Sequence, residues 1–359
     1  MLKRIEKISI EMNTEPKIYQ EGNPWQNKVY LHMSAYLETK GVVSFGQSVN
    51  GNTFKHLLTE EQSEYNFITK EIHTATLNRF KDHKAGDLKR ILTNTAASQP
   101  YCFNLIIYLQ QHLELANKLF SVLLNKQVKV IHLEPEFTPN TCNDIEGFKM
   151  GMDESIGDQA GNKGTDADIA VFYTYENNKK GLILIEFKFI EAEFSTCSSY
   201  REKGQIRNVC DSSTYFEDLV VQKKRDSFKN YICGYNKYLN WQLTKESMVL
   251  DIKTINSSSH CPFRFGLNQL WRNMILAERV ASTRNYDEFG FWVFSPSEND
   301  KYLWKNGETE SQFRAILTKQ GNDFFRKVHL ESIFEILHEI VSEEKDRYWL
   351  NKMEERYRI

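Results

Sequence analysis

Apolar residues concentrate in the middle of the chain, and their spacing separates helices from strands. Residues 97–125 carry apolar side chains at too many positions for a helix with one solvated face, which predicts a long, well-buried helix. Short apolar runs bounded by polar or turn-forming residues are typical of buried strands. The predicted strands are 128–137, 168–175, 181–190 and 289–294, and an amphipathic helix is predicted at 265–283.

The segments around these elements are polar. Residues 1–95 and the charged region from about 308 onward have mostly helical patterns. The glycine-rich stretch 138–164 predicts a long loop, and 195–260 predicts irregular chain with short helices near 215–240. The order of elements predicts an α/β fold with a mixed sheet and helices packed on it. The expected parts are a helical N-terminal extension (1–95), a core with an insertion near 195–260 (96–296) and a C-terminal helical extension (297–359).

The amino-acid composition argues against several functional classes for this protein. The chain has 46 Lys and Arg against 48 Asp and Glu, a net charge of -2. This balance argues against a protein that coats nucleic acid non-specifically, but it leaves room for a local basic cleft. None of the six cysteines forms a CxxC pair, and no Cys/His cluster has zinc-ligand spacing. With no apolar run of the ~18 residues that span a bilayer, we expect no membrane association and a cytoplasmic location.

The strand at 181–190 contains two charged residues that need an explanation. Glu186 and Lys188 stand two apart in an apolar run, so their side chains project from the same face. Burying a charge without a partner is costly. The two residues therefore form either a structural ion pair at the end of a core strand or part of a functional site.

A carboxylate on the preceding strand favours the functional alternative. Asp168 opens that strand, with Asp166 two residues before it. If the two strands pair through the link at 176–180, Asp168 and Glu186 approach each other. Two carboxylates near one lysine suit a hard divalent cation, which favours oxygen ligands. Such a cation supports phosphodiester hydrolysis, in which Lys188 would orient the attacking water or stabilise the added negative charge.

At these residues the chain resembles the PD-(D/E)XK nuclease superfamily, whose members have a restriction-endonuclease-like core. The family pattern is an acidic residue opening one core strand and Glu-x-Lys on the next, here Asp168 and Glu186-Phe187-Lys188. Ala167 stands where the proline of the motif name would be. The resemblance implies Asp168, Glu186 and the Phe187 carbonyl as ligands of Mg²⁺, which Mn²⁺ can replace, and Lys188 as the catalytic lysine. It further implies an endonuclease acting on nucleic acid, with double-stranded DNA the expected substrate, in restriction, defence or repair.

Three further segments resemble one bacterial branch of restriction-endonuclease-like proteins, so that the resemblance covers about residues 97–296. They are Ala-Ser-Gln-Pro-Tyr-Cys-Phe-Asn at 97–104, Glu-Phe-Lys-Phe-Ile-Glu at 186–191 and Asn-Gln-Leu-Trp-Arg-Asn-Met-Ile-Leu-Ala-Glu at 268–278. Gln269, Arg272 and Asn273 share one helix face. The resemblance implies that polar residues of this helix support the active site or the nucleic acid. The alternative is a polar stripe exposed to solvent.

Three other carboxylates flank the predicted site. Glu134 and Glu136 share a face of the strand at 128–137, and some family members recruit an additional glutamate as a metal ligand. For Glu134 we leave open a supporting role or an exposed strand face, and for Glu136 we expect the exposed face. Glu191 is expected to close the core strand with a salt bridge to an Arg or Lys, without a catalytic role.

Three alternatives remain open on the sequence. A non-catalytic nucleic-acid-binding or assembly module could keep the same fold. An RNA nuclease would keep the chemistry and change the substrate. A structural protein with a chance ion pair would hold Glu186 and Lys188 far from Asp168. A homodimer would suit double-strand cleavage, although no sequence feature demonstrates one.

Overall fold

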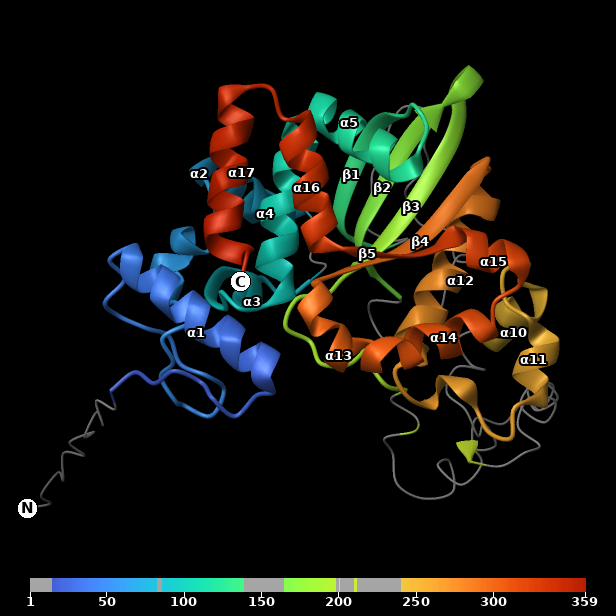
Figure 1. Cartoon of the computed structure of the whole chain (residues 1–359), viewed down its shortest axis with the longest axis horizontal. Coiled ribbons are helices and arrows are strands. Elements are labelled where there is room, and N and C mark those ends of the chain that lie inside the picture. The colour runs from blue at the N-terminus through green and yellow to red at the C-terminus, as the bar shows by residue number, and fades with distance from the viewer. Residues whose placement is uncertain (1–14, 83–85, 139–164, 198–199, 201–209, 212–239) are drawn as a thin grey trace, which may run out of the picture.

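The computed structural model, which describes residues 15–82, 86–138, 165–197, 200, 210–211 and 240–359, is built around one five-stranded sheet (Figure 1). Its strands are β1 (Lys129–Phe137), β2 (Ala167–Tyr175), β3 (Lys179–Phe187), β4 (Glu288–Ser295) and β5 (Phe325–His329). They lie in the order β1-β2-β3-β4-β5. The first three strands pair antiparallel, whereas β3, β4 and β5 pair parallel. The predicted mixed sheet is therefore confirmed.

Helices cover both faces of this sheet (Figure 1). One face is covered by α4 and α5, with α16 and α17 packed beside them, and α12 covers the other face along β3 and β4. The helices are α1 (Pro24–Thr39), α2 (Lys70–Asp82), α3 (Leu88–Thr93), α4 (Ser98–Gln111), α5 (Leu113–Leu124), α10 (Asn240–Glu246), α11 (Ile252–Ser257), α12 (Leu267–Arg284), α13 (Asp300–Leu303), α14 (Glu308–Ala315), α15 (Lys319–Phe324), α16 (Leu330–Ile340) and α17 (Glu344–Tyr357). Short 3₁₀ turns are η1 (Glu60–Asn66), η2 (Glu176–Asn178), η5 (Pro262–Arg264), η6 (Ser297–Asn299) and η7 (Lys305–Gly307).

Strand β3 separates two hydrophobic cores. Ile183 and Ile185 face the core under α4 and α5, while Leu182 and Leu184 face the core under α12. This alternation is the two-residue period of a strand that is buried on both sides. Continuing it by one step turns the side chain of Glu186 toward α12.

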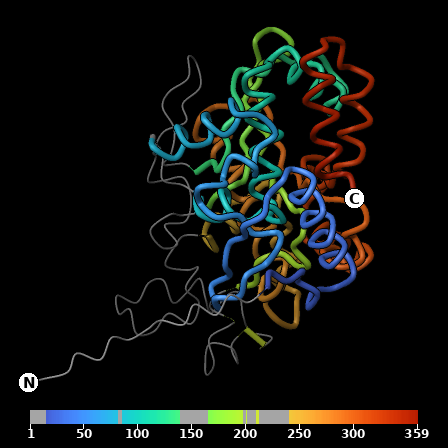
Figure 2. The backbone as a smooth tube through the Cα atoms, turned by 90° about the vertical axis from the view of Figure 1, so that its left-hand side faces the viewer, coloured from blue at the N-terminus to red at the C-terminus, as the bar shows by residue number. Residues whose placement is uncertain are grey.

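The C-terminal helix α17 packs into the core under α4 and α5. The ring of Tyr357 stacks on Tyr101 of α4 with centroids 3.8 Å apart, and Trp349 stacks on Tyr108 at 4.1 Å. Arg356 is fully buried and lies over the Tyr36 ring of α1. The end of α17 consequently lies beside α1, as Figures 1 and 2 both show. The last helix is thus joined to the same core as the first.

Two expectations about the elements are wrong. Residues 97–125 form two helices, because His112 leaves helical geometry and its ring Nδ1 lies 2.9 Å from the Tyr108 carbonyl. The chain is not helical throughout from residue 308, because β5 adds a parallel edge strand to the sheet. This strand carries Arg326 and Lys327, and charged residues are common on edge strands, where they oppose pairing with other chains.

Some expectations fall on parts of the chain that the structure does not describe. Apart from Thr138, the predicted loop at 138–164 lies outside the described residues. The short helices expected near 215–240 also lie outside them, except for Asn240, where α10 begins. Within the described ranges, no helix has the length and apolar character needed to cross a membrane.

We predict that replacing Trp349 with alanine will destabilise the whole fold. The side chain is 1% exposed, and removing a buried tryptophan costs about 3–5 kcal/mol. Tyr348→Ala is the matched control, since Tyr348 is 59% exposed and its loss should change stability by less than about 0.5 kcal/mol. Denaturant unfolding followed by circular dichroism measures both. Loss of α17 alone, with the remaining transition unshifted, would contradict the shared core.

Candidate active site

Asp168, Glu186 and Lys188 lie together where β2 and β3 reach the edge of the core. The Nζ of Lys188 is 2.7 Å from Oε1 of Glu186, and the backbone N–H of Phe187 donates to Oδ2 of Asp168 over 2.6 Å. The carboxyls of Asp168 and Glu186 are close enough that each shifts the pKa of the other. A structural protein with a chance ion pair predicted these residues far apart, and that prediction of distance is wrong.

The position of the three residues follows from the pairing of the strands. Ile169 pairs with Ile185, so Asp168 and Glu186 occupy adjacent places on the same face. Lys188 lies just past the end of β3, but its backbone N–H still donates to the Phe294 carbonyl of β4 over 2.8 Å. Pairing of β3 with β2 and β4 therefore holds these three side chains on an ordered backbone.

Helix α12, which covers the face of β3 toward which Glu186 points, contributes polar side chains to the site. Nε2 of Gln269 donates to Oε1 of Glu186 over 2.6 Å, and Nδ2 of Asn273 donates to Oε2 over 2.7 Å. Arg272 donates from its guanidinium to Oγ1 of Thr165, the nearest contact at 2.9 Å. The predicted polar face of this helix is thus turned to the site and to the residues before β2. An exposed stripe is excluded for Asn273, which is 2% exposed.

Glu136 also belongs to this carboxylate cluster, which the sequence did not indicate. The expected exposed position is wrong, since the side chain is 5% exposed. Glu136 has φ 52°, a left-handed conformation that is uncommon for residues other than glycine and that breaks the strand alternation. Its Oε1 accepts a hydrogen bond from Nε2 of Gln99 in the first turn of α4, at 2.8 Å. Gln99 lies in the segment 97–104 that resembles restriction-endonuclease-like proteins, but no pattern in the sequence indicated its hydrogen bond to Glu136.

Glu134 has structural partners instead. Its carboxylate lies 2.8 Å from the Arg79 guanidinium of α2 and 2.8 Å from the His132 ring. It is opposite Ala170 in the register of β1 and β2, two residues further along β2 than Asp168. The exposed strand face is excluded here also, because Glu134 is 6% exposed. Its negative charge is paired with the Arg79 guanidinium, and this ion pair links α2 to β1.

Glu191 closes the segment after β3, as predicted. Its carboxylate accepts hydrogen bonds from Oγ of Ser98 at 2.8 Å and from the backbone of Phe189 at 2.9 Å, and Arg90 lies 3.3 Å away. Burial would raise the pKa of Glu191, but the positive charge of Lys188 and these donors hold it below its ordinary value. Glu191 therefore remains an anion beside Lys188.

If all of its carboxyls were ionised, the cluster would carry more negative charge than its protein partners neutralise. Burial, followed by Glu186 and Glu136, raises the pKa of Asp168 well above its ordinary value. Burial also raises the pKa of Glu186, although Lys188 opposes the shift, and raises that of Glu136 to about 7. Burial lowers the pKa of Lys188, but the Glu186 carboxylate outweighs it and the net shift is upward. A site with these charges favours a bound cation.

The donor set fits a hard divalent cation only if other oxygens complete the coordination. Among the described residues, no group of three His, Cys, Asp or Glu side chains is arranged to hold a metal ion. Magnesium typically binds through one or two carboxylates and keeps several waters or substrate oxygens. Asp168 and Glu186 meet that requirement, with the Phe187 carbonyl beside them in sequence. A cation at Glu186 would compete with the Lys188 ammonium for Oε1.

Comparison with known proteins agrees with this geometry. The family model described as the PD-(D/E)XK nuclease superfamily matches residues 20–227 and 262–359. The match is wider than the region of resemblance at 97–296 and includes both β5 and the C-terminal helices. No curated protein and no solved structure matches the chain.

We predict that Glu136→Gln will change how stability depends on pH in the presence of EDTA. The folded pKa of about 7 lies above the ordinary 4.5, so the stabilising contribution of Glu136 is complete below pH 4.5 and is lost as pH rises through 7. The variant lacks this loss. Its stability relative to the parent should rise by roughly 2–3 kcal/mol between pH 5 and pH 8, measured by urea unfolding.

The matched variant Glu134→Gln should behave differently. It leaves the buried Arg79 guanidinium without its carboxylate, which should destabilise the fold by about 3 kcal/mol at neutral pH. If the parent and Glu136→Gln lose stability in parallel from pH 5 to pH 8, the assignment of the shift to Glu136 is wrong.

Proposed function

Because the chain belongs to the PD-(D/E)XK nuclease superfamily, we propose that it is a divalent-metal-dependent nuclease that hydrolyses phosphodiester bonds. We assign the catalytic roles to Asp168, Glu186 and Lys188. The observation that carries this proposal is their convergence at the end of β3, where Lys188 and Glu186 are 2.7 Å apart and Asp168 is held by the Phe187 amide. Members of this superfamily are generally nucleases that use divalent metal ions.

The metal in this proposal is Mg²⁺, which Mn²⁺ can replace. Asp168, Glu186 and the carbonyl of Phe187 would hold it. When bound, such an ion polarises a phosphate oxygen and lowers the pKa of a coordinated water. The excess of buried carboxylates over nearby cations supports this assignment, because a divalent cation would neutralise it.

The residues of the chain itself then orient the reacting groups. In this proposal the Lys188 ammonium acts as a charged hydrogen-bond donor to the attacking water and to the developing negative charge. Gln269 and Asn273 hold the two oxygens of Glu186 in place. Arg272 anchors Thr165 ahead of β2 and so supports the backbone that carries Asp168.

We propose double-stranded DNA as the substrate and endonucleolytic cleavage as the reaction, in restriction, defence or repair. A homodimer would place two such sites on the two strands of a duplex. None of the six cysteines forms a CxxC pair, which supports a reducing, cytoplasmic compartment. An RNA substrate is the alternative within the same chemistry, and the cleavage assay below includes it.

A non-catalytic module with this fold is the second alternative. Buried charges cost free energy unless they are paired, and a module without chemistry gains nothing from the cluster of Asp168, Glu186 and Glu136. This cost favours the enzyme. The module predicts nucleic-acid binding without cleavage and no affinity for Mg²⁺ or Mn²⁺ at the cluster.

We predict that Lys188→Ala will strongly slow metal-dependent cleavage. Plasmid DNA, single-stranded DNA and RNA would each be incubated with the parent and the variant in Mg²⁺, Mn²⁺ or EDTA. The parent should cut only with metal, and the rate should fall on the order of 100- to 1000-fold in the variant, as for loss of one donor to a developing charge.

Lys126→Ala is the matched control. Lys126 also forms an ion pair on the sheet, with Glu288, but it lies at the other end of β3 and should leave the cleavage rate unchanged. Circular dichroism verifies that both variants fold. Equal cleavage by Lys188→Ala and the parent would contradict the catalytic assignment, whereas binding without cleavage on all substrates would favour the module.

A further inference from the structure

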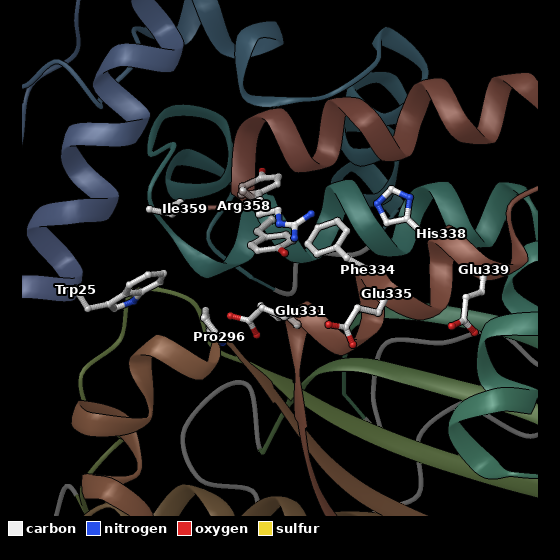
Figure 3. Close-up of a pocket in the computed structure, with 12 residues that line it drawn as sticks. Trp25, Pro296, Glu331, Phe334, Glu335, His338, Glu339, Arg358 and Ile359 are labelled. Atoms are coloured by element: carbon white, nitrogen blue, oxygen red, sulfur yellow. The ribbon is translucent and has the colours of Figure 1, made fainter.

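A pocket of about 360 Å³ opens on the face of the sheet away from α12 (Figure 3). Its walls come from α1 and α4 and from the C-terminal helices α16 and α17, which are far from the first two in the sequence. Pro296, just after β4, closes one side. The candidate active site does not use this pocket, because Glu186 and its partners project from the opposite face of β3.

The inner wall of the pocket is aromatic. Trp25, Tyr101, Phe334 and Tyr357 line it, and each is less than 9% exposed. Aromatic faces attract cations through their quadrupole, and they also cover the apolar stem of a long side chain. The wall therefore suits a ligand that combines an apolar chain with a positive charge.

A row of carboxylates follows one side of the same pocket. Glu331, Glu335 and Glu339 are spaced four residues apart on α16, which places them on one helix face. Figure 3 shows them in line beneath Phe334 and His338. Glu331 accepts hydrogen bonds from the backbone N–H and hydroxyl of Ser297. The other two are exposed at the mouth.

The cationic groups of the lining do not neutralise this row. His338 lies 3.0 Å and Arg358 2.8 Å from Glu354, a residue outside the lining. In the part of the chain that the structure describes, no Lys, Arg or His forms an ion pair with Glu335 or Glu339. The mouth of the pocket thus has an excess of negative charge, which repels phosphate groups and attracts a cation.

We propose that this pocket is a docking site for an arginine side chain of a partner polypeptide. A guanidinium is planar, so it stacks on aromatic rings while its N–H groups reach carboxylates in a fork. A metal ion is a poor occupant, because the carboxylates are spread along α16 and, among the described residues, no three acidic, His or Cys side chains are arranged to hold one. The cavity holds one long side chain, and the row of carboxylates extends along α16 toward the flanking peptide.

The fluorescence of Trp25 can report on binding at this pocket. Trp25 lines it and donates its indole N–H to the Phe189 carbonyl over 2.8 Å, and Phe189 follows Lys188 directly. An occupant that contacts the Trp25 ring should change its fluorescence. Binding can therefore be followed without any measurement of nuclease activity, so the two proposals fail independently.

The test titrates the full chain with a short capped peptide that has one central arginine. Binding is followed by tryptophan fluorescence and calorimetry at low salt. We expect saturable binding, weakened on the order of tenfold in the double variant Glu335→Gln, Glu339→Gln, as loss of two partly screened ion pairs implies. Glu344→Gln on α17 is the matched control, because Glu344 is exposed and outside the lining, and should bind like the parent.

Three results would overturn the proposal. One is equal binding of a peptide with citrulline in place of arginine, since citrulline lacks the charge. Another is binding of spermidine as tight as that of the peptide, which would make a free polyamine the occupant. The third is no saturable binding of any probe. Thermal unfolding of the double variant at the parent temperature verifies that lost binding does not reflect lost folding.

Discussion

The buried pair of Glu186 and Lys188 is the constraint on which the site is built. Both side chains are less than 9% exposed, and the desolvation of two buried charges can exceed their attraction. Additional hydrogen bonds offset this cost, because Gln269 and Asn273 of α12 each donate to one of the two Glu186 carboxylate oxygens. This requirement explains why a long helix with polar residues at a buried face lies across β3 and β4.

The two faces of the sheet contribute differently to the electrostatics of the protein. On the α12 face, the carboxylates at the end of β3 form a compact cluster that suits a divalent cation between protein and phosphate. On the α16 face, the carboxylates are spread along a helix beside aromatic rings, an arrangement that suits an organic cation. Ligands of open α/β sheets commonly bind beyond the carboxyl ends of the strands, and both sites lie near the ends of β3 and β4. Nucleic acid is expected only at the first.

The features predictable from sequence are those with a regular period. Alternation along β3 placed Glu186 and Lys188 on one face, and helical spacing placed Gln269 and Asn273 together on α12. The left-handed conformation of Glu136 has no such signal, because glutamate rarely adopts it, so this buried carboxylate was missed. Strand β5 has only five residues, of which Arg326 and Lys327 are charged, and its pairing with β4 depends on tertiary contacts. The break at His112 is likewise a local backbone change within a continuous apolar pattern.

Anomalous diffraction from crystals soaked in Mn²⁺ would test whether Asp168 and Glu186 hold a divalent cation. We expect an anomalous peak between these two carboxylates, within bonding distance of the Phe187 carbonyl, with the Lys188 ammonium displaced from Oε1 of Glu186. A well-ordered site without a peak, with Lys188 still bound to Glu186, would show that the pair is structural and that these carboxylates hold no metal.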